Sequence, residues 1–203
     1  MGDPVSKPVW FVLAALIAMA TGLALITGMS TGRGEAQLPV LGQVPEFELT
    51  SQHDRLVHSD ELSGKIWVAD LIFTACSGPC LRMTSQMTRV QESMKEWDDF
   101  RMVSISVDPE RDTPERLTWY AEQTLADPDI WIFLTGEMDV IRSLAVEGLK
   151  LVVEKEEGSA GILHSDRFVL VDDTGRIRGY YDGTDPDAVD EMIRAARGLL
   201  KTL

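Results

Sequence analysis

The sequence is poor in basic residues, and it lacks internal repeats and low-complexity tracts. Its 203 residues include 19 lysines and arginines against 33 aspartates and glutamates, for a formal net charge of −14. No basic patch interrupts this acidity, which argues against nucleic acid as a partner. The acidic surface suits solubility and would also suit a positively charged partner. Residues 35–203 are long enough for one domain with a real hydrophobic core.

Charge is missing altogether from residues 8–29, a run long enough to cross a hydrocarbon core of roughly 30 Å as a helix. Trp10 near one end suits a membrane interface. A cleaved signal peptide would have a shorter apolar run and a small-x-small cleavage site. We therefore predict a cytoplasmic tail (1–7), an uncleaved transmembrane anchor (8–29), a linker (30–42) and a domain (43–203). The expected location is the bacterial cytoplasmic membrane, with the C-terminal domain in the periplasm or outside the cell.

Cysteine is scarce too, since Cys76 and Cys80 are the only two. A disulfide across so short a loop restricts the unfolded chain little, so a purely structural bridge would be a weak staple. The pair sits where an apolar strand pattern gives way to a helix pattern, and amides at a helix N-terminus lower a thiol pKa. A soft cation such as Cu(I) favours two thiolates with an imidazole. His164, from a different loop, is the candidate third ligand.

The rest of the pattern alternates between strands and helices. It predicts an N-terminal hairpin, a buried strand interrupted by Asp70, three further helices and strands, and a closing hairpin and helix. The expected strands cover 47–50, 56–57, 66–73, 101–107, 131–134, 149–153, 168–171 and 177–181, and the expected helices cover 79–97, a segment starting at Thr113, 137–147 and 187–200. This order resembles an α/β thioredoxin-like fold with an added N-terminal β-hairpin and a helix-strand insertion.

Three segments carry a resemblance to one family. The segment from Phe73 to Cys80 resembles the metal-binding turn of the Sco/SenC family, membrane-anchored proteins of cytochrome c oxidase assembly. The segment from Ser106 to Pro114 is similar to the second signature of that family. Leu163-His164-Ser165, running into residues 168–172, is similar to the third. The likeness extends from about residue 40 to the C-terminus.

The resemblance implies a function and a site. Cys76 and Cys80 would be a redox pair and the thiolate ligands of a copper ion, Cu(I) and/or Cu(II), with His164 as imidazole ligand. Asp70 matches an acid that the family often has just before its cysteine turn, in the second shell of the site. The implied function is a copper chaperone with thiol-disulfide activity that assists assembly of the dinuclear copper centre of cytochrome c oxidase. Its partners would be the copper-ligating oxidase subunit and a copper donor or thiol reductant.

Two alternatives stay open. A thiol-disulfide oxidoreductase would keep the copper-ligand cysteines of the oxidase reduced, and it would not need His164. A membrane-anchored copper or redox sensor would leave the copper content of the oxidase unchanged. Within the turn, many family members have Cys-Pro-Asp-x-Cys-Pro where this chain has Cys-Ser-Gly-Pro-Cys-Leu. Other soft or titratable residues are interpreted as structural: His53 and His58 as exposed, and Met83, Met87 and Met94 as helix core.

Overall fold

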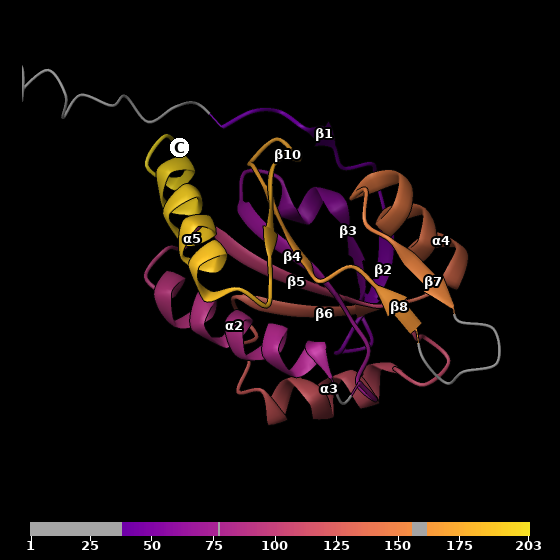
Figure 1. Cartoon of the computed structure of the whole chain (residues 1–203). Helices are drawn as coiled ribbons and strands as arrows, with labels where there is room; N and C mark the ends of the chain where they lie inside the picture. Colours follow the sequence, from indigo (N-terminus) through magenta and orange to yellow (C-terminus); the bar gives the residue numbers. More distant parts are fainter. Residues whose placement is uncertain (1–37, 77, 156–161) are drawn as a thin grey trace, which may run out of the picture. The chain divides into compact units, whose positions relative to one another are not determined.

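The computed structural model describes residues 38–76, 78–155 and 162–203, and these belong to one compact unit, Leu38–Leu203 (Figure 1). The predicted anchor, the tail before it and residues 30–37 of the predicted linker lie outside the described residues. Within the described residues, no helix combines the length and the apolar character needed to cross a membrane.

An eight-stranded mixed sheet forms the centre of the unit, in the order β1-β10-β9-β4-β5-β6-β2-β3. Three neighbouring strands are parallel, and every other pairing in the sheet is antiparallel. The strands are β1 (Gly42–Gln43), β2 (Glu48–Ser51), β3 (Leu56–His58), β4 (Ile66–Ile72), β5 (Phe100–Ser106), β6 (Trp131–Thr135), β9 (Arg167–Val171) and β10 (Arg176–Asp182). The parallel trio is β4-β5-β6. A separate two-stranded sheet pairs β7 (Val153–Lys155) with β8 (Ile162–His164).

Both faces of the central strands are covered, which is why β4 is buried along its whole length. One core joins the sheet to α2 (Pro79–Met94), α3 (Pro114–Gln123) and α5 (Pro186–Leu200). The second core lies on the other face and includes residues of α4 (Met138–Arg142) and of the π-helix η2 (Ser143–Gly148). A short 3-10 helix, η1 (Ser59–Leu62), follows β3. Figure 1 shows α2 and α3 on the opposite side of the sheet from α4.

The described N-terminal residues run along β10. Leu41 N donates to Ile177 O over 2.8 Å, and Val44 N donates to Gly175 O over 2.9 Å. The Arg178 guanidinium donates to the carbonyl oxygens of Leu38 and Pro39. Residues 38–42, assigned to the linker from the sequence, are thus held against the domain.

Most predicted elements are confirmed with shifts of one to three residues. The hairpin β2-β3 forms, and Thr113 caps α3 by accepting a hydrogen bond from Arg116 N. The methionines predicted as core, Met83, Met87 and Met94, are fully buried in α2. The strand predicted at 149–153 is wrong, because Lys150 has a left-handed backbone with φ of 57° that turns the chain, and the strand starts only at Val153.

Candidate thiol and metal site

The two cysteines follow the carboxyl end of β4 at the centre of the sheet. The chain leaves β4 at Phe73, and Cys76 N donates to Phe73 O over 3.2 Å in the turn that follows. Helix α2 begins at Pro79, so Cys80 is the second residue of its first turn. Strand β4 and helix α2 therefore place the pair at the junction that the sequence predicts.

The two thiols differ in exposure, and the environment of Cys80 changes its acidity. Cys76 is partly exposed, whereas Cys80 retains 2% of its accessible surface. Burial, followed by a hydrogen bond with Cys76, raises the pKa of the Cys80 thiol well above its usual range, and the nearby Asp70 carboxyl adds to the rise. The expected lowering of the thiol pKa does not hold for Cys80, because burial and the Cys76 thiol outweigh the backbone hydrogen bond at Phe73, which acts to lower that pKa. Cys76 is accordingly the sulfur that an external partner can reach.

Three buried polar side chains are joined by hydrogen bonds beneath the first turns of α2. Asp70 is 1% exposed, and its Oδ1 accepts a hydrogen bond of 2.5 Å from Ser104 Oγ, which in turn accepts one of 2.9 Å from Trp131 Nε1. Asp70 Oδ2 has no hydrogen-bond partner in the described structure. Burial raises the pKa of Asp70 to about 7, and the Ser104 bond opposes that rise. The predicted burial of this acid is confirmed.

Tyr120 brings α3 into the same region. Its hydroxyl lies 2.8 Å from Thr84 Oγ1 on α2. Burial raises the pKa of Tyr120 to about 12, and the neighbouring groups Asp70, Cys80 and Cys76 contribute to the rise. The phenol, the carboxyl group and the two thiols are therefore within electrostatic range of one another.

The histidine comes from the separate two-stranded sheet. His164 ends β8 and is paired in register with Val153 of β7, and Ser165 N continues the ladder by donating to Val152 O over 3.0 Å. The side chain of His164 lies outside the part of the chain that the structure describes, so its role as a ligand stays a prediction. Among the described side chains, no three His, Cys, Asp or Glu residues gather as a metal site.

The structure adds a set of contacts at the start of the cysteine turn that the sequence did not suggest. Asp112, which is fully buried, accepts hydrogen bonds from Thr74 N (3.0 Å), Thr74 Oγ1 (2.6 Å) and Ser106 Oγ (2.6 Å). Arg116 Nε donates to Thr74 Oγ1 over 2.9 Å, and its guanidinium lies 4.1 Å from the ring centroid of Trp119. The sequence signals for this region were the helix start at Thr113 and the family-like segment from Ser106 to Pro114, and neither indicated the bonds to Thr74.

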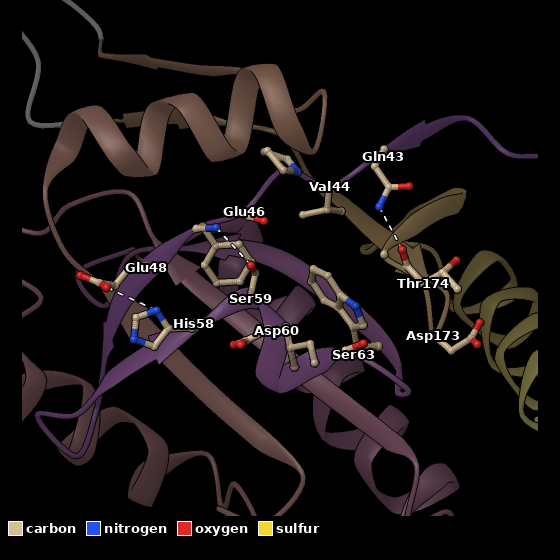
Figure 2. Close-up of a pocket in the computed structure, with 15 residues that line it drawn as sticks. Gln43, Val44, Glu46, Glu48, His58, Ser59, Asp60, Ser63, Asp173 and Thr174 are labelled. Carbon is tan, nitrogen blue, oxygen red and sulfur yellow. Dashed lines mark hydrogen bonds and ion pairs between the residues drawn. The ribbon is translucent and has the colours of Figure 1, made fainter.

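A hollow in the described structure lies away from the cysteines. It has a volume of about 640 Å³ and is lined by Trp67, near the start of β4, whereas the cysteines follow the end of that strand. Figure 2 shows Gln43 bonded to Thr174 at its rim, over 2.9 Å, and His58 paired with Glu48 over 3.3 Å. His53 and His58 are exposed, as predicted. This hollow is separate from the thiol pair.

Comparison with known proteins decides the family. Residues 38–201 match the SCO1/SenC family along nearly the whole described unit. The chain belongs to the SCO1/SenC family. It is 33% identical over 177 residues to the SCO1 protein homolog of Bacillus subtilis (strain 168), which covers 86% of this chain and 92% of the relative.

Solved Sco structures share the fold. BsSco, described as a member of the Sco family of cytochrome c oxidase assembly proteins and as carrying a disulfide switch, is 33% identical with a TM-score of 0.72. That match covers 82% of this chain and 99% of BsSco. Bradyrhizobium japonicum ScoI with copper bound is 23% identical with a TM-score of 0.66, covering 78% of this chain and 99% of that one, and shows the likeness of fold. The predicted thioredoxin-like domain is thus confirmed as that of a Sco protein.

Proposed function

We propose that this chain binds copper through Cys76, Cys80 and His164 and delivers it to the copper-ligating subunit of a haem-copper oxidase during assembly of the dinuclear copper centre. The observation that carries the proposal is the pair of cysteines at the β4–α2 junction, one partly exposed and one buried. Membership of the SCO1/SenC family supports it. The fold itself can hold copper, as the copper-bound ScoI of Bradyrhizobium japonicum illustrates.

The proposed ligands, two cysteines and a histidine, suit copper. Two thiolates with an imidazole match the preference of Cu(I) for soft ligands. Because ligating thiols must lose their protons, and burial raises the pKa of Cys80, copper uptake at this site would release protons and strengthen as pH rises. Asp70 would act from beneath the pair, because ionisation of its carboxyl would place a negative charge near Cys80 and raise the pKa of that thiol.

Redox state would gate the site. When Cys76 and Cys80 close a disulfide, they give up two electrons and two protons to an oxidised partner, and neither sulfur remains available as a thiolate ligand. The disulfide switch described for BsSco supports this part of the proposal. A thiol reductant would be needed to return the pair to its copper-binding form.

An anaerobic copper titration of the reduced full chain in mild detergent, with a competing chelator, tests the proposal. We expect one tight equivalent, lost or weakened at least about tenfold in Cys76→Ser, Cys80→Ser and His164→Ala. His53→Ala is the matched control, because His53 is exposed in the β2–β3 turn, and it should bind as wild type does. Binding that is indifferent to both cysteines would refute the copper site.

A thiol-disulfide oxidoreductase is the second candidate function, favoured by the unequal exposure of the two thiols. It would reduce the copper-ligand cysteines of the oxidase by exchange, starting at Cys76. In cells lacking the wild-type protein, His164→Ala would then restore oxidase copper content while Cys76→Ser would not. If cells lacking the protein have the same oxidase copper content as wild-type cells, a copper or redox sensor becomes the better account.

We further propose that residues 8–29 anchor the chain in the bacterial cytoplasmic membrane with the domain on the outer side. The support is the uncharged length of this segment. The chain should stay in the membrane pellet after an alkaline wash, and protease added to intact spheroplasts should digest the domain. Release by the wash, or protection from the protease, would contradict the anchor or its orientation respectively.

A further inference from the structure

The contacts at Thr74 concern how the cysteine turn is held. Asp112 sits in the segment between β5 and α3, yet its carboxylate binds both the backbone and the hydroxyl of Thr74, 38 residues earlier. Thr74 lies two positions before Cys76. The carboxylate therefore fixes the chain at the point where it leaves β4 and enters the turn.

A buried carboxylate is costly unless hydrogen bonds satisfy it, so this arrangement is strongly defined. Ser106 Oγ supplies a further donor to Asp112 Oδ2, and it also accepts a hydrogen bond from Asp108 N over 3.1 Å. Asp112 N donates to Asp108 O over 2.9 Å, which holds the backbone of the segment as well. Asp112 is thus held from both its backbone and its side chain.

Arg116 extends the contacts to α3. Its Nε donates to Thr74 Oγ1, so that hydroxyl accepts from Arg116 and donates to Asp112. The guanidinium is steadied by the Trp119 ring, and Arg116 N is bound by the Thr113 side chain. The Thr74 hydroxyl is thus held by two partners, one that donates to it and one that accepts from it, while the two cysteines are still thiols.

The far end of the turn is held by burial. Cys80 is packed in the first turn of α2, so the segment between Thr74 and Pro79 is bounded by one fixed point on each side. The position of Cys76 relative to Cys80 depends on where Thr74 is fixed. A loosened Thr74 would let Cys76 sample positions from which its sulfur cannot meet that of Cys80.

We propose that Asp112, supported by Arg116, is a positioning residue that holds Cys76 within bonding reach of Cys80. This rests on the proposed function, because it concerns the same thiol pair. Its measurable consequence is the equilibrium in which the two thiols and oxidised glutathione give the Cys76–Cys80 disulfide and two reduced glutathione molecules. Both sulfur–hydrogen bonds break, one intramolecular sulfur–sulfur bond forms, and glutathione takes the two electrons and two protons.

The test is to equilibrate the full chain anaerobically in glutathione buffers, trap the thiols by alkylation and measure the disulfide fraction by mass spectrometry. In Asp112→Asn an NH2 group replaces one carboxylate oxygen, and this donor faces the N–H or O–H donor that the oxygen had accepted from. Thr74 is then held less firmly, so we expect the equilibrium constant for disulfide formation to fall about tenfold. Thr74→Val keeps the backbone donor and loses only the hydroxyl, so we expect about a threefold fall.

Asp172→Asn is the matched control. Asp172 is 1% exposed and accepts from Thr174 N (3.0 Å) and Thr174 Oγ1 (2.8 Å), the same pattern as at Asp112, but beyond the other end of β4. It should lower the melting temperature and leave the glutathione equilibrium within twofold of wild type. A purely structural role destabilises both redox forms equally, and by linkage it leaves this equilibrium unmoved.

An equilibrium constant for Asp112→Asn within twofold of wild type would overturn the proposal. If that variant does not fold, Thr74→Val decides in the same way, since it is nearly isosteric. If the wild-type chain forms no Cys76–Cys80 disulfide at any glutathione ratio, the thiol chemistry of the proposed function fails and the positioning role fails with it. Loss of copper binding alone, with the glutathione difference intact, would refute only the copper site.

Discussion

Asp70 is a carboxyl group held almost out of water with one oxygen unpartnered among the described residues. Because its folded pKa is raised from 3.8 to about 7, the folded chain keeps a proton that the unfolded chain has lost between those values. Stability therefore falls as pH rises from about 4 to about 7. We predict that Asp70→Asn removes this loss and is more stable than wild type by about 2–4 kcal/mol at pH 8, with little difference near pH 4.

Thermal or urea unfolding at several pH values measures this, and Ser104→Ala provides a companion variant. Without the Ser104 hydroxyl, the hydrogen bond of 2.5 Å to Asp70 Oδ1 is lost. The decline in stability should still begin near pH 4 but continue to a higher pH than in wild type, because the folded pKa of Asp70 rises when the Ser104 bond is lost. An Asp70→Asn variant with the same pH profile as wild type would show that Asp70 is ionised throughout the neutral range.

The unequal thiols lead to a prediction about reactivity. Cys76 is partly exposed, whereas Cys80 is buried and its pKa is raised by burial and by Cys76. Since the thiolate is the reactive form, iodoacetamide at pH 8 should modify Cys76 at least about tenfold faster than Cys80. Mass spectrometry of the reduced chain measures the two rates, with Cys76→Ser and Cys80→Ser as single-thiol references. Equal rates would contradict the described burial.

For single residues, the sequence predicted which side chains carry the chemistry, but it did not predict the hydrogen bonds that hold those side chains in place. Two cysteines four positions apart can be recognised locally, and so can the threonine cap of α3. The bond between Thr74 and Asp112 joins residues 38 positions apart, and it depends on β4 and β5 ending side by side. The raised pKa of Cys80 was missed for a related reason, because its main cause is burial, which depends on long-range packing that the sequence around the turn does not reveal.

Among the elements, η2 is held by a close approach to the chain before β2. A Cβ added at Gly148 would lie 2.8 Å from Pro45 Cδ, and a proline ring cannot swing aside. We predict that Gly148→Ala lowers the free energy of unfolding by about 1–3 kcal/mol. Gly42→Ala is the control, because its Cβ would meet only Ile177 Cδ1, at an ordinary 3.4 Å, and denaturant unfolding should detect little change.

Strands and helices with strong periodicity were predicted closely, and the irregular segment was not. Strand β4 is apolar on both faces apart from Asp70, and α2 places its methionines at helical spacing, so both are evident from residue types. The segment after α4 depends on a π-helix and on a left-handed Lys150, neither of which has a distinctive sequence signal. The eight-strand order is also a product of long-range pairing, such as β2 with β6.

For the molecule as a whole, Asp172 links segments from both ends of the described chain. Its Oδ2 accepts from Arg178 over 2.8 Å, and that arginine also reaches Leu38 and Pro39. Burial acts to raise the pKa of Asp172, but hydrogen bonds from Arg178, Arg176 and Thr174 outweigh it and lower the pKa to about 2. The stabilisation is therefore complete above about pH 4 and is lost as pH falls through 2.

Asp172→Asn should cost about 3 kcal/mol at pH 7, because it leaves the mostly buried Arg178 without its carboxylate. The difference from wild type should shrink below pH 4, where wild type itself begins to lose the interaction. Urea unfolding across this range measures both effects. A constant difference at every pH would assign the loss to packing rather than to the ion pair.

The segment from Leu38 to Val44 also determines where a truncated version of the protein can begin. A shortened protein beginning at residue 35 would keep β1 paired with the edge strand β10. One beginning at residue 45 would expose that edge and remove the carbonyl group of Pro39, to which Arg178 donates. An uncovered strand edge is a template for pairing with another copy. A boundary chosen a few residues too late would thus make the domain prone to edge-to-edge association, although both cysteines would be retained.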